Sequence, residues 1–291
     1  MVSAAFDYAR AASWDDAVAQ LTAGGEDARA IAGGQSLVPM MMLRLAAPSV
    51  LVDLGPIVSP PVRCEDDALE VPALTRHAEL EESAVIRDAC PMLAEAAAHI
   101  GNVRVRRRGT IGGSLAHGEP SAELACVALA HGATVRAVGP AGERTIPAAD
   151  LVVGALVTSL APGELITSVR IPRLRDDQGS AFVELARRAG DFAMVEVAAI
   201  VTLGDGGVIS DARVVLGATG DRPVDHSALA GPLTGRAPAD AVFAEVADAV
   251  AAAAAIGPSS HAGAAYRRRM VAVLVRRALR AAAARAGERA R

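Results

Sequence analysis

The chain has 291 residues, 52% hydrophobic and 21% charged, so it is long enough for two modest domains and too apolar to be disordered. Its formal net charge of -4 argues against a nucleic-acid-binding protein, which would normally be basic overall. All 29 basic residues are arginine, which excludes chemistry through a lysine Schiff base.

Residues 1–56 are interpreted as a small α/β unit, because short apolar strands alternate with helical patterns. The expected elements are a helix capped by Ser13 and ended by Gly24-Gly25, a strand at 28–31, a helix from Leu37 to Leu45 and a strand at 50–54. The strand at 28–31 runs straight into a first glycine pair, in Ala32-Gly33-Gly34-Gln35-Ser36. The run Met40-Met41-Met42 predicts core packing, and the Pro-rich segment 55–61 predicts a linker.

Residues 57–175 predict a second unit that contains the second glycine pair. Its expected elements are helices at 79–89 and 91–100 and strands at 134–138 and 165–171. The basic cluster Arg104, Arg106, Arg107 and Arg108, interpreted mainly as a solvated edge, leads into Thr110-Ile111-Gly112-Gly113-Ser114. Pro120 suits the first turn of a helix that continues through Leu124, Val127 and Ala128.

Residues 176–291 predict a sheet followed by helices. The expected elements are strands at 181–185, 193–203 and 208–216, a hairpin turn at 204–207, a helix at 239–255 with Pro238 at its start, and a final helix. That final helix is expected to bury Tyr266, Met270, Val273 and Leu274, with its arginines largely on other faces. We expect it to pack on the preceding sheet, although a basic amphipathic helix could also bind a membrane surface.

The two glycine pairs predict the binding of an extended anion. Adjacent glycines let ligand atoms approach the main chain, and successive N–H groups in such a turn form an anion-binding nest. A dinucleotide pyrophosphate is one ligand of this kind. No lysine follows either pair and neither is a Gly-x-Gly-x-x-Gly sequence, which excludes the two commonest nucleotide-binding motifs.

No catalytic group stands out among the side chains. The six histidines lack the spacing of a metal site, and there is no Gly-x-Ser-x-Gly nucleophile motif. Cys64, Cys90 and Cys126 are too few for an iron–sulfur cluster and are interpreted as small buried hydrophobes. Neither a signal peptide nor an apolar stretch of about 20 residues is visible, so we expect a cytoplasmic protein.

Together the motifs resemble a known family. Residues 32–37 with 110–114 are similar to the paired FAD motifs of the molybdenum hydroxylases, in the separate FAD-binding medium subunit of enzymes such as aerobic carbon monoxide dehydrogenase. The FAD domain of xanthine dehydrogenase is a more distant relative. Further matches, in the family's order, are Arg44-Leu45 before Leu51–Leu54, then Pro162–Thr167, Arg187–Ala193 and Ala265–Arg268.

The resemblance implies an α+β fold. A two-lobed FAD-binding domain of the PCMH/vanillyl-alcohol-oxidase type would comprise lobe 1 (1–56) and lobe 2 (57–175). A C-terminal domain (176–291) with a small antiparallel sheet packed against helices would follow.

The resemblance also implies roles for individual residues. The implied cofactor-binding residues are Arg29, Ala32, Gly33, Gly34, Gln35, Ser36, Leu37, Thr110, Ile111, Gly112, Gly113, Ser114, Glu123, Leu165 and Ile166. The two glycine segments would wrap the FAD diphosphate, Leu37 would pack close to the cofactor, Arg29 would face the adenylate half and Glu123 the ribityl chain. Leu165 and Ile166 would border the adenine or the flavin ring.

Three further residues are considered beside that set. Glu119 stands where relatives often have Asp, which puts a direct FAD contact in doubt. His117, beside the second glycine pair, could contact the flavin or carry it covalently, and it is interpreted as a noncovalent residue at the entry of the helix. Phe182 lies in the segment that approaches the flavin ring in relatives, in an unfixed register.

The implied function is electron transfer. Electrons from a molybdenum cofactor in a large subunit would pass through two [2Fe–2S] clusters in a small subunit to FAD here, and then to an external acceptor. A dimer of heterotrimers is the expected assembly, without nucleic acid and with at most peripheral membrane contact. Two alternatives stay open: a self-sufficient FAD-dependent reductase, and a non-catalytic scaffold subunit whose glycine turns are only structural.

Overall fold

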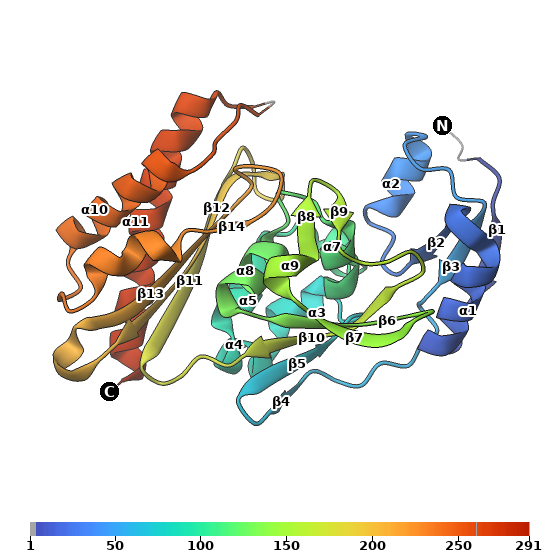
Figure 1. The fold of residues 1–291 in the computed structure, drawn as a ribbon, viewed down its shortest axis with the longest axis horizontal. Coiled ribbons are helices and arrows are strands. Elements are labelled where there is room, and N and C mark those ends of the chain that lie inside the picture. Colours follow the sequence, from blue (N-terminus) through green and yellow to red (C-terminus); the bar gives the residue numbers. More distant parts are fainter. Residues whose placement is uncertain (1–3, 260, 291) are drawn as a thin grey trace.

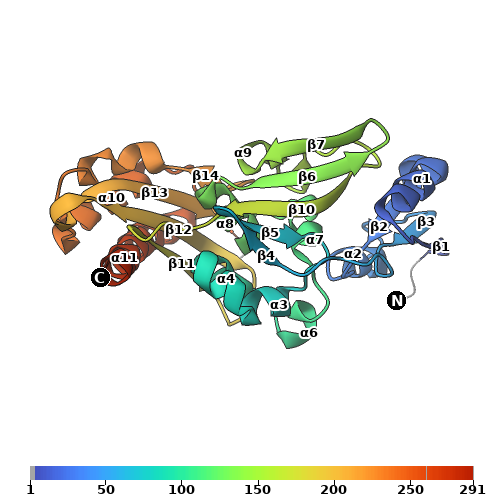
Figure 2. The same cartoon turned by 90° about the horizontal axis from the view of Figure 1, so that it is seen from below.

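The computed structural model describes residues 4–259 and 261–290, whose three larger sheets lie in a row (Figures 1 and 2), with β8 (Val152–Gly154) and β9 (Val157–Thr158) forming a separate two-stranded sheet. Lobe 1 is a parallel sheet of order β1-β3-β2 with two helices. Its elements are β1 (Asp7–Arg10), α1 (Trp14–Gly24), η1 (Gly25–Asp27), β2 (Ala28–Ile31), α2 (Leu37–Met42) and β3 (Val50–Asp53). Ser13 caps α1 as predicted, because its Oγ accepts a hydrogen bond from Asp16 N–H at 3.1 Å.

Lobe 2 is an antiparallel sheet of order β4-β5-β10-β6-β7, with α3, α4 and α7 on one face (Figure 2). The strands are β4 (Arg63–Glu65), β5 (Ala68–Pro72), β6 (Thr134–Gly139), β7 (Gly142–Pro147) and β10 (Leu165–Pro172). The other elements are α3 (His77–Glu82), α4 (Ala84–Ala89), α5 (Pro91–His99), α6 (Val103–Arg106), α7 (Ile111–His117), α8 (Glu123–His131), α9 (Ala148–Leu151), β8 (Val152–Gly154) and β9 (Val157–Thr158).

The C-terminal sheet has the order β11-β12-β13-β14 and is antiparallel. Its elements are β11 (Gln178–Ala186), β12 (Ala193–Leu203), η2 (Asp205–Gly207), β13 (Ile209–Gly217), β14 (Val224–Asp225), η3 (Ser227–Leu233), α10 (Asp240–Ala253) and α11 (Ala264–Arg289). One face packs on α10 and α11, and the other packs on α5 and α8 of lobe 2. Because both faces are covered, β12 is apolar along nearly its whole length.

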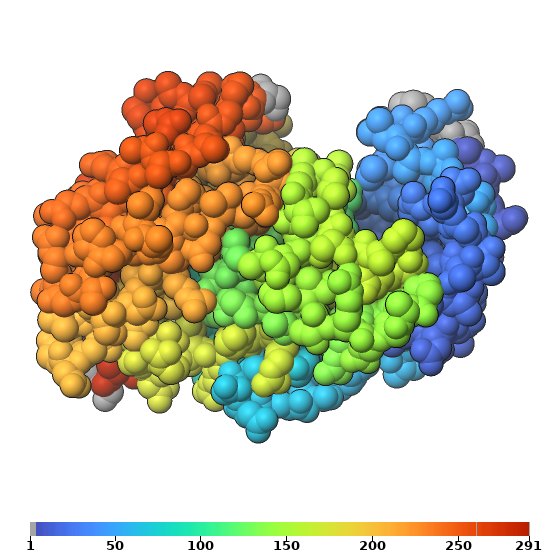
Figure 3. All heavy atoms as spheres, viewed as in Figure 1, coloured from blue at the N-terminus to red at the C-terminus, as the bar shows by residue number. Residues whose placement is uncertain are grey.

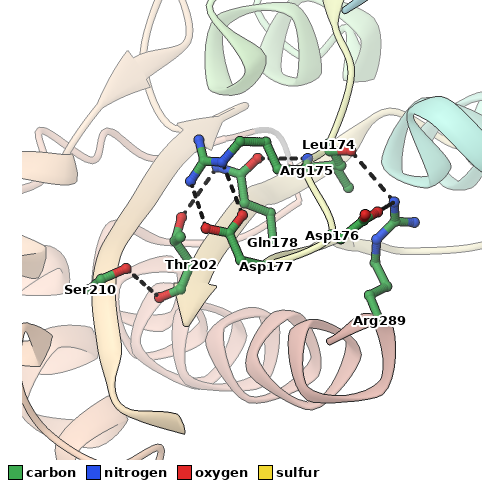
Figure 4. A network of polar contacts seen from close by, with 8 residues as sticks. All are labelled: Leu174, Arg175, Asp176, Asp177, Gln178, Thr202, Ser210 and Arg289. Atoms are coloured by element: carbon green, nitrogen blue, oxygen red, sulfur yellow. Dashed lines mark hydrogen bonds and ion pairs between the residues drawn. The ribbon is translucent and has the colours of Figure 1, made fainter. Parts of the chain in front are cut away.

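Polar contacts tie the start of the C-terminal sheet to its last helix (Figure 4). Arg289, at the end of α11, donates to Leu174 O (3.5 Å) and lies 3.8 Å from Asp176. Gln178 Nε2 donates to Thr202 Oγ1 (3.2 Å), across β11 and β12. These contacts stabilise the passage from lobe 2 into the sheet. No helix in the described part of the chain is both long and apolar enough to cross a membrane.

Several helix predictions differ from the structure in their boundaries. Segment 79–89 is divided between α3 and α4, because Ser83 takes an extended backbone and caps α4 by accepting from Ile86 N–H (3.4 Å). Pro120 and Pro238 both lie outside the helices that they were expected to start. These prolines still precede helices, but in the connections rather than the first turns.

The methionine-rich helix α2 is shorter and more exposed than predicted. It ends at Met42, and Arg44 follows with a positive φ of 59°. Met41 is buried, whereas Leu45 is 70% exposed. The core-packing prediction therefore holds for Met41 only.

The buried face of α11 also differs from the prediction. Tyr266 and Val273 are 40% and 41% exposed, whereas Arg267 is buried. The Arg267 guanidinium donates from Nε to Met194 O (3.0 Å) and from its other nitrogens to Ala218 O and Gly257 O. These three carbonyl groups accept the hydrogen bonds of a buried guanidinium group, which the helical periodicity of the sequence had predicted on an exposed face.

Candidate functional site

The first glycine pair forms an open turn between β2 and α2. Among the described residues, none accepts a hydrogen bond from the five consecutive backbone N–H groups of residues 33–37. Gly34 has a φ of 69°, and Gln35 Nε2 donates to Gly33 O (3.0 Å), which stabilises the turn. Successive free N–H groups of this kind form a nest that binds anions.

The second glycine pair is built differently, because it is the first turn of helix α7. The N–H groups of residues 111–114 are all bonded within the protein, to the carbonyl oxygens of Thr75, Ala73 and Thr110 and to Thr110 Oγ1 (2.9–3.2 Å). Thr110 is thus the N-cap of α7. This turn offers a ligand its exposed main chain at Gly113 and the hydroxyl of the half-buried Ser114, rather than a run of free N–H groups.

The two turns touch each other through Gly33. A Cβ on Gly33 would overlap the carbonyl of Arg108 and lie 2.7 Å from Gly109 Cα, so only hydrogen fits there. Gly113 is open, and a Cβ there would have only Thr110 Oγ1 within 4 Å, at 2.8 Å. Figure 3 shows a notch in the surface between lobe 1 (blue) and lobe 2 (green). We call residues 33–37 and 110–114 the glycine cradle.

The basic residues before the second turn are engaged to different degrees. Arg106 Nε donates to Glu81 Oε2 (2.7 Å), and its Nη1 donates to Ile100 O and Gly101 O, so it stabilises the local fold. Arg104, Arg107 and Arg108 are exposed. They form a positively charged edge beside the cradle.

The remaining predicted residues lie in different environments. Arg29 is exposed and its Nη1 donates to the carbonyls of its own loop, Glu26 O (2.5 Å) and Ala28 O (2.8 Å). Leu165 is buried in the core of lobe 1, whereas Ile166 is buried in the core of lobe 2. These two neighbours on β10 therefore join the lobes.

His117 and Glu119 frame the C-terminal end of α7. His117 is half-buried, and burial lowers the pKa of its imidazole, which favours the neutral form. The Glu119 carboxylate accepts hydrogen bonds from Ser121 Oγ (3.0 Å) and N–H (3.4 Å). Glu119 thus stabilises the connection between α7 and α8.

One buried cysteine–histidine pair is structural. Cys90 Sγ lies 3.2 Å from His131 Nε2, and His131 Nδ1 lies 3.2 Å from Pro172 O. Burial raises the pKa of Cys90 to about 12 and lowers that of His131 to about 4, so both are neutral. A neutral thiol is a poor nucleophile. Within residues 4–259 and 261–290, no group of three or more His, Cys, Asp or Glu side chains is placed to hold a metal ion.

Two features of the C-terminal sheet were not anticipated from the sequence. Phe182, expected near the cofactor, is 4% exposed and packs in the core, whereas Phe192 is 72% exposed. Glu184 and Glu196 are buried side by side on adjacent strands. The signal for the second feature was available, because Glu196 is the single charged residue within the apolar run of β12.

Comparison with known proteins agrees with this architecture. The family described as the FAD binding domain in molybdopterin dehydrogenase matches residues 4–174, and the CO dehydrogenase flavoprotein C-terminal domain matches residues 180–282. The chain is 41% identical to the 6-hydroxypseudooxynicotine dehydrogenase complex subunit alpha of Paenarthrobacter nicotinovorans, over 94% of this chain and 93% of that one. It is 37% identical to the carbon monoxide dehydrogenase medium chain of Afipia carboxidovorans, over 98% and 99%.

Solved structures give the same result. Carbon monoxide dehydrogenase from Hydrogenophaga pseudoflava superposes with a TM-score of 0.93 at 34% identity, covering 98% of this chain and 99% of that one. Quinoline 2-oxidoreductase from Pseudomonas putida 86 gives a TM-score of 0.93 at 32% identity, with the same coverage.

These matches define the class as FAD-binding oxidoreductase components with a two-part, mixed α/β architecture. The chain belongs to the family of flavoprotein subunits of molybdopterin dehydrogenases, with the carbon monoxide dehydrogenase medium chain among its relatives. The predicted family, fold class and FAD-binding character are thereby confirmed.

Proposed function

We propose that this chain holds FAD in the glycine cradle and is the electron-transfer subunit of a molybdenum-containing hydroxylase or dehydrogenase. The observation that carries the proposal is the run of five free N–H groups at residues 33–37, held against the second turn. Such a nest suits the diphosphate of FAD. FAD, when bound, supplies the electron chemistry, while the protein supplies binding and orientation.

The chain's own residues divide the work of binding. The free N–H groups of residues 33–37 and the Ser36 hydroxyl bind the diphosphate, and the bare main chain at Gly113 lets the cofactor approach α7 closely. Leu37, Leu165 and Ile166 supply apolar contact. The further residues assigned to the cofactor are Arg29, Ala32, Thr110, Ile111, Gly112, Ser114 and Glu123.

We further propose that electrons reach FAD from two [2Fe–2S] clusters in a small partner subunit. The oxidised substrate would bind at a molybdenum cofactor in a large partner subunit, within a cytoplasmic dimer of heterotrimers. Relatives named as a complex subunit and as medium chains support a multi-subunit assembly. An external acceptor would then reoxidise this chain.

The substrate is assigned to the large subunit rather than to this chain. Relatives 31–41% identical to this chain are named for 6-hydroxypseudooxynicotine, carbon monoxide, caffeine and glyceraldehyde dehydrogenases. Similar medium chains thus occur in enzymes named for unrelated molecules, which supports a shared electron-transfer role.

The test is an absorption spectrum of the chain after co-expression with its genomic neighbours and purification by a tag on this chain alone. We expect flavin bands, iron–sulfur absorbance and two co-purifying partner chains. A yellow chain that purifies alone would instead indicate a self-sufficient flavin reductase. A colourless chain that added FAD cannot reconstitute would contradict the proposed site and favour a scaffold role.

A further inference from the structure

Three buried carboxyl groups and one partly exposed histidine lie where lobe 2 packs against the C-terminal sheet. We call this group the acidic junction. Its members are Glu123 from α8, Glu184 from β11, Glu196 from β12 and His99 from α5. None of them belongs to the glycine cradle, and only Glu123 was assigned a role above.

Glu196 is the centre of the junction. Its side chain is fully buried, and neither carboxyl oxygen has a hydrogen-bond partner among the described residues. Glu184 is its direct cross-strand neighbour, is 4% exposed and leaves Oε2 without a partner in the same part of the chain. Gly217, opposite on β13, provides the space, because a Cβ there would overlap Glu196 Oε2.

This arrangement is stable only if the junction holds protons. Cross-strand neighbours have Cβ atoms about 4.5–5.5 Å apart, and like charges directly opposite are destabilising. Burial of an ionised carboxylate without a partner is more costly still. A proton held on Glu196 removes the repulsion and replaces an unpartnered buried charge with a neutral carboxyl group.

The surrounding elements supply little positive charge. The ionisable groups whose charge acts on Glu196 are Glu184 from β11, Glu123 and Cys126 from α8, and Glu119 from the α7–α8 connection. On α5, His99 interacts with Glu184, Glu123 and Glu95. Arg285 of α11 pairs with Glu95 (2.7 Å), which also accepts a hydrogen bond from Phe182 N–H (3.0 Å).

His99 is the member of the junction that reaches solvent. Its side chain is 44% exposed, and its Nδ1 lies 3.2 Å from Glu184 Oε1. The hydrogen bond with Glu184 raises the pKa of His99, which favours an imidazolium beside the carboxylate. A proton entering from water therefore meets His99 before it meets the carboxyl groups.

The pKa directions agree with this geometry. Burial, followed by the charge of Glu123 and then of Glu184, raises the pKa of Glu196 well above its usual range. Burial raises the pKa of Glu123 to about 7, so this group exchanges its proton near neutral pH. Glu123 is the first residue of α8, six residues beyond the end of α7, whose first turn belongs to the cradle.

We propose that the acidic junction is a proton-loading site that takes protons from solvent through His99 and supplies them, by way of Glu123, to the flavin when it is reduced. This proposal rests on the proposed function. Iron–sulfur clusters deliver single electrons without protons, so flavin reduced by them must take its proton from the protein or from water.

The transfer balances as follows. Two electrons from the partner subunit's clusters and one proton convert FAD to its singly protonated reduced form. The proton leaves a carboxyl O–H bond of the junction and forms an N–H bond on the flavin ring. The junction is left with one additional negative charge, which a proton from solvent, entering at His99, neutralises.

The first experiment examines the full chain without FAD. Infrared spectroscopy at neutral pH should show the carbonyl stretch of a protonated carboxylic acid that shifts in D2O. The band should lose its Glu196 component in Glu196→Gln, leaving only the part that Glu123 contributes, and it should be unchanged in the control Glu245→Gln, which changes an exposed carboxylate that pairs with Arg236. Absence of the band from the wild-type chain would show that the junction holds no proton and would overturn the proposal.

A second variant distinguishes a displaced Glu196 carboxyl group from a misfolded chain. Gly217→Ala keeps Glu196 but pushes its carboxyl group out of place. We expect the band to shift in frequency in a chain whose circular dichroism is unchanged. An unshifted band in that variant would mean that the carboxylic acid lies elsewhere, and it would overturn the assignment to Glu196.

The second experiment examines the assembled, FAD-loaded complex. Reduction with dithionite should change the intensity of the carboxyl band, and Glu196→Gln should lose that change while retaining the wild-type FAD content. An unchanged band on reduction would overturn the link to the flavin. A wild-type chain that binds no FAD would fail the proposed function instead, while the first experiment would still decide whether the junction holds a proton.

The third experiment examines the route from solvent. Hydrogen–deuterium exchange of the carboxyl band should slow by about tenfold or more in His99→Leu, because a positioned acid–base side chain speeds proton transfer. His99→Gln, which keeps a polar side chain without a titratable group, should slow it as well. Exchange at the wild-type rate in both variants would remove His99 from the route.

Discussion

The glycine cradle offers backbone groups to an anion, whereas the acidic junction buries side chains that can themselves carry negative charge. The cradle must bind an anion. It does so with main-chain N–H groups that donate no hydrogen bond to any described residue, and with glycines that leave room for a ligand. The junction must bury carboxyl groups, and it does so with side chains whose charge depends on pH. Backbone groups do not titrate, so of these two regions only the junction is sensitive to protons.

The two regions also fail in different ways when they are changed. A methyl group in the cradle removes ligand space or separates the two turns, so FAD binding is the quantity that responds. A change in the junction alters how many protons the folded chain holds, so the pH dependence of stability responds. Variants in each region should therefore leave the other region's property intact.

Gly33→Ala should have the largest effect on the cradle. The added methyl overlaps Arg108 O, so the two turns must move apart, and overpacking of this kind costs about 1–3 kcal/mol. We expect FAD affinity to fall by about tenfold to a hundredfold, since each 1.4 kcal/mol is a factor of ten. Flavin fluorescence titration of the FAD-free chain measures it. Gly231→Ala, with no atom within 4 Å of the new methyl, is the control, and equal affinities in both variants would contradict contact between the turns.

Gly113→Val should weaken FAD binding with little loss of fold. The branched side chain fills the open face of α7, where we expect the cofactor, and the affinity should fall by about tenfold or more. Its Cβ also approaches Thr110 Oγ1, and loss of that N-cap costs about 1 kcal/mol. Thr110→Ala isolates the cap effect, because it leaves Gly113 open. Full FAD occupancy in Gly113→Val would remove the second turn from the site.

Gly112→Ala should destabilise the fold more than it affects the ligand directly. A Cβ at this position would lie 2.5 Å from Ala73 Cβ and 2.9 Å from Ala73 O, a clash that costs about 1–3 kcal/mol. Urea unfolding of the chain measures the loss. The double variant Ala73→Gly/Gly112→Ala should recover part of it, because one of the two clashing atoms is gone. No recovery would mean that the main chain of Ala73 decides the clash.

The three glycine predictions show what the sequence could and could not indicate. Both glycine pairs were recognised from the sequence as one kind of turn, because the local motif is the same. The structure separates them, since only the first leaves its N–H groups free and only Gly113 of the second is open. Part of that difference depends on Ala73 and Thr75, which follow β5 about forty residues away and accept from the N–H groups of residues 111 and 112, and no local pattern encodes those two contacts.

The fold shows the same division between local and distant causes. Strands 28–31 and 193–203 and the cap at Ser13 were predicted correctly, because propensity and capping act within a few residues. The predicted buried face of α11 was right for Leu274 and wrong for Tyr266 and Val273. Arg267 is buried instead, because it finds three carbonyl groups that arrive from distant segments. Glu196 was overlooked for the same reason, since its partner Glu184 is defined only by strand register.

The smallest effect should be on the pH dependence of stability, where the junction rather than the cradle is tested. Glu196 and Glu123 have raised folded pKa values, so the native chain holds more protons than the unfolded chain above the usual carboxyl range, and stability falls as pH rises. His131 and His77, whose pKa values burial lowers to about 4, give the opposite slope below about pH 6.5.

Glu196 is therefore best tested at about pH 7.5 to 8.5, where unfolded histidine is already largely neutral. There, the free energy of unfolding of Glu196→Gln minus that of the wild type should rise by about 1 kcal/mol per pH unit, close to the limit of about 1.4 for one proton. Urea unfolding at several pH values measures the slope.

Gly33→Ala should keep the wild-type slope despite its weaker FAD binding, because it changes no titratable group. A parallel pH dependence for Glu196→Gln and the wild type would show that Glu196 keeps an ordinary pKa. The junction would then be no more sensitive to pH than the cradle, and the contrast between the two regions would not hold.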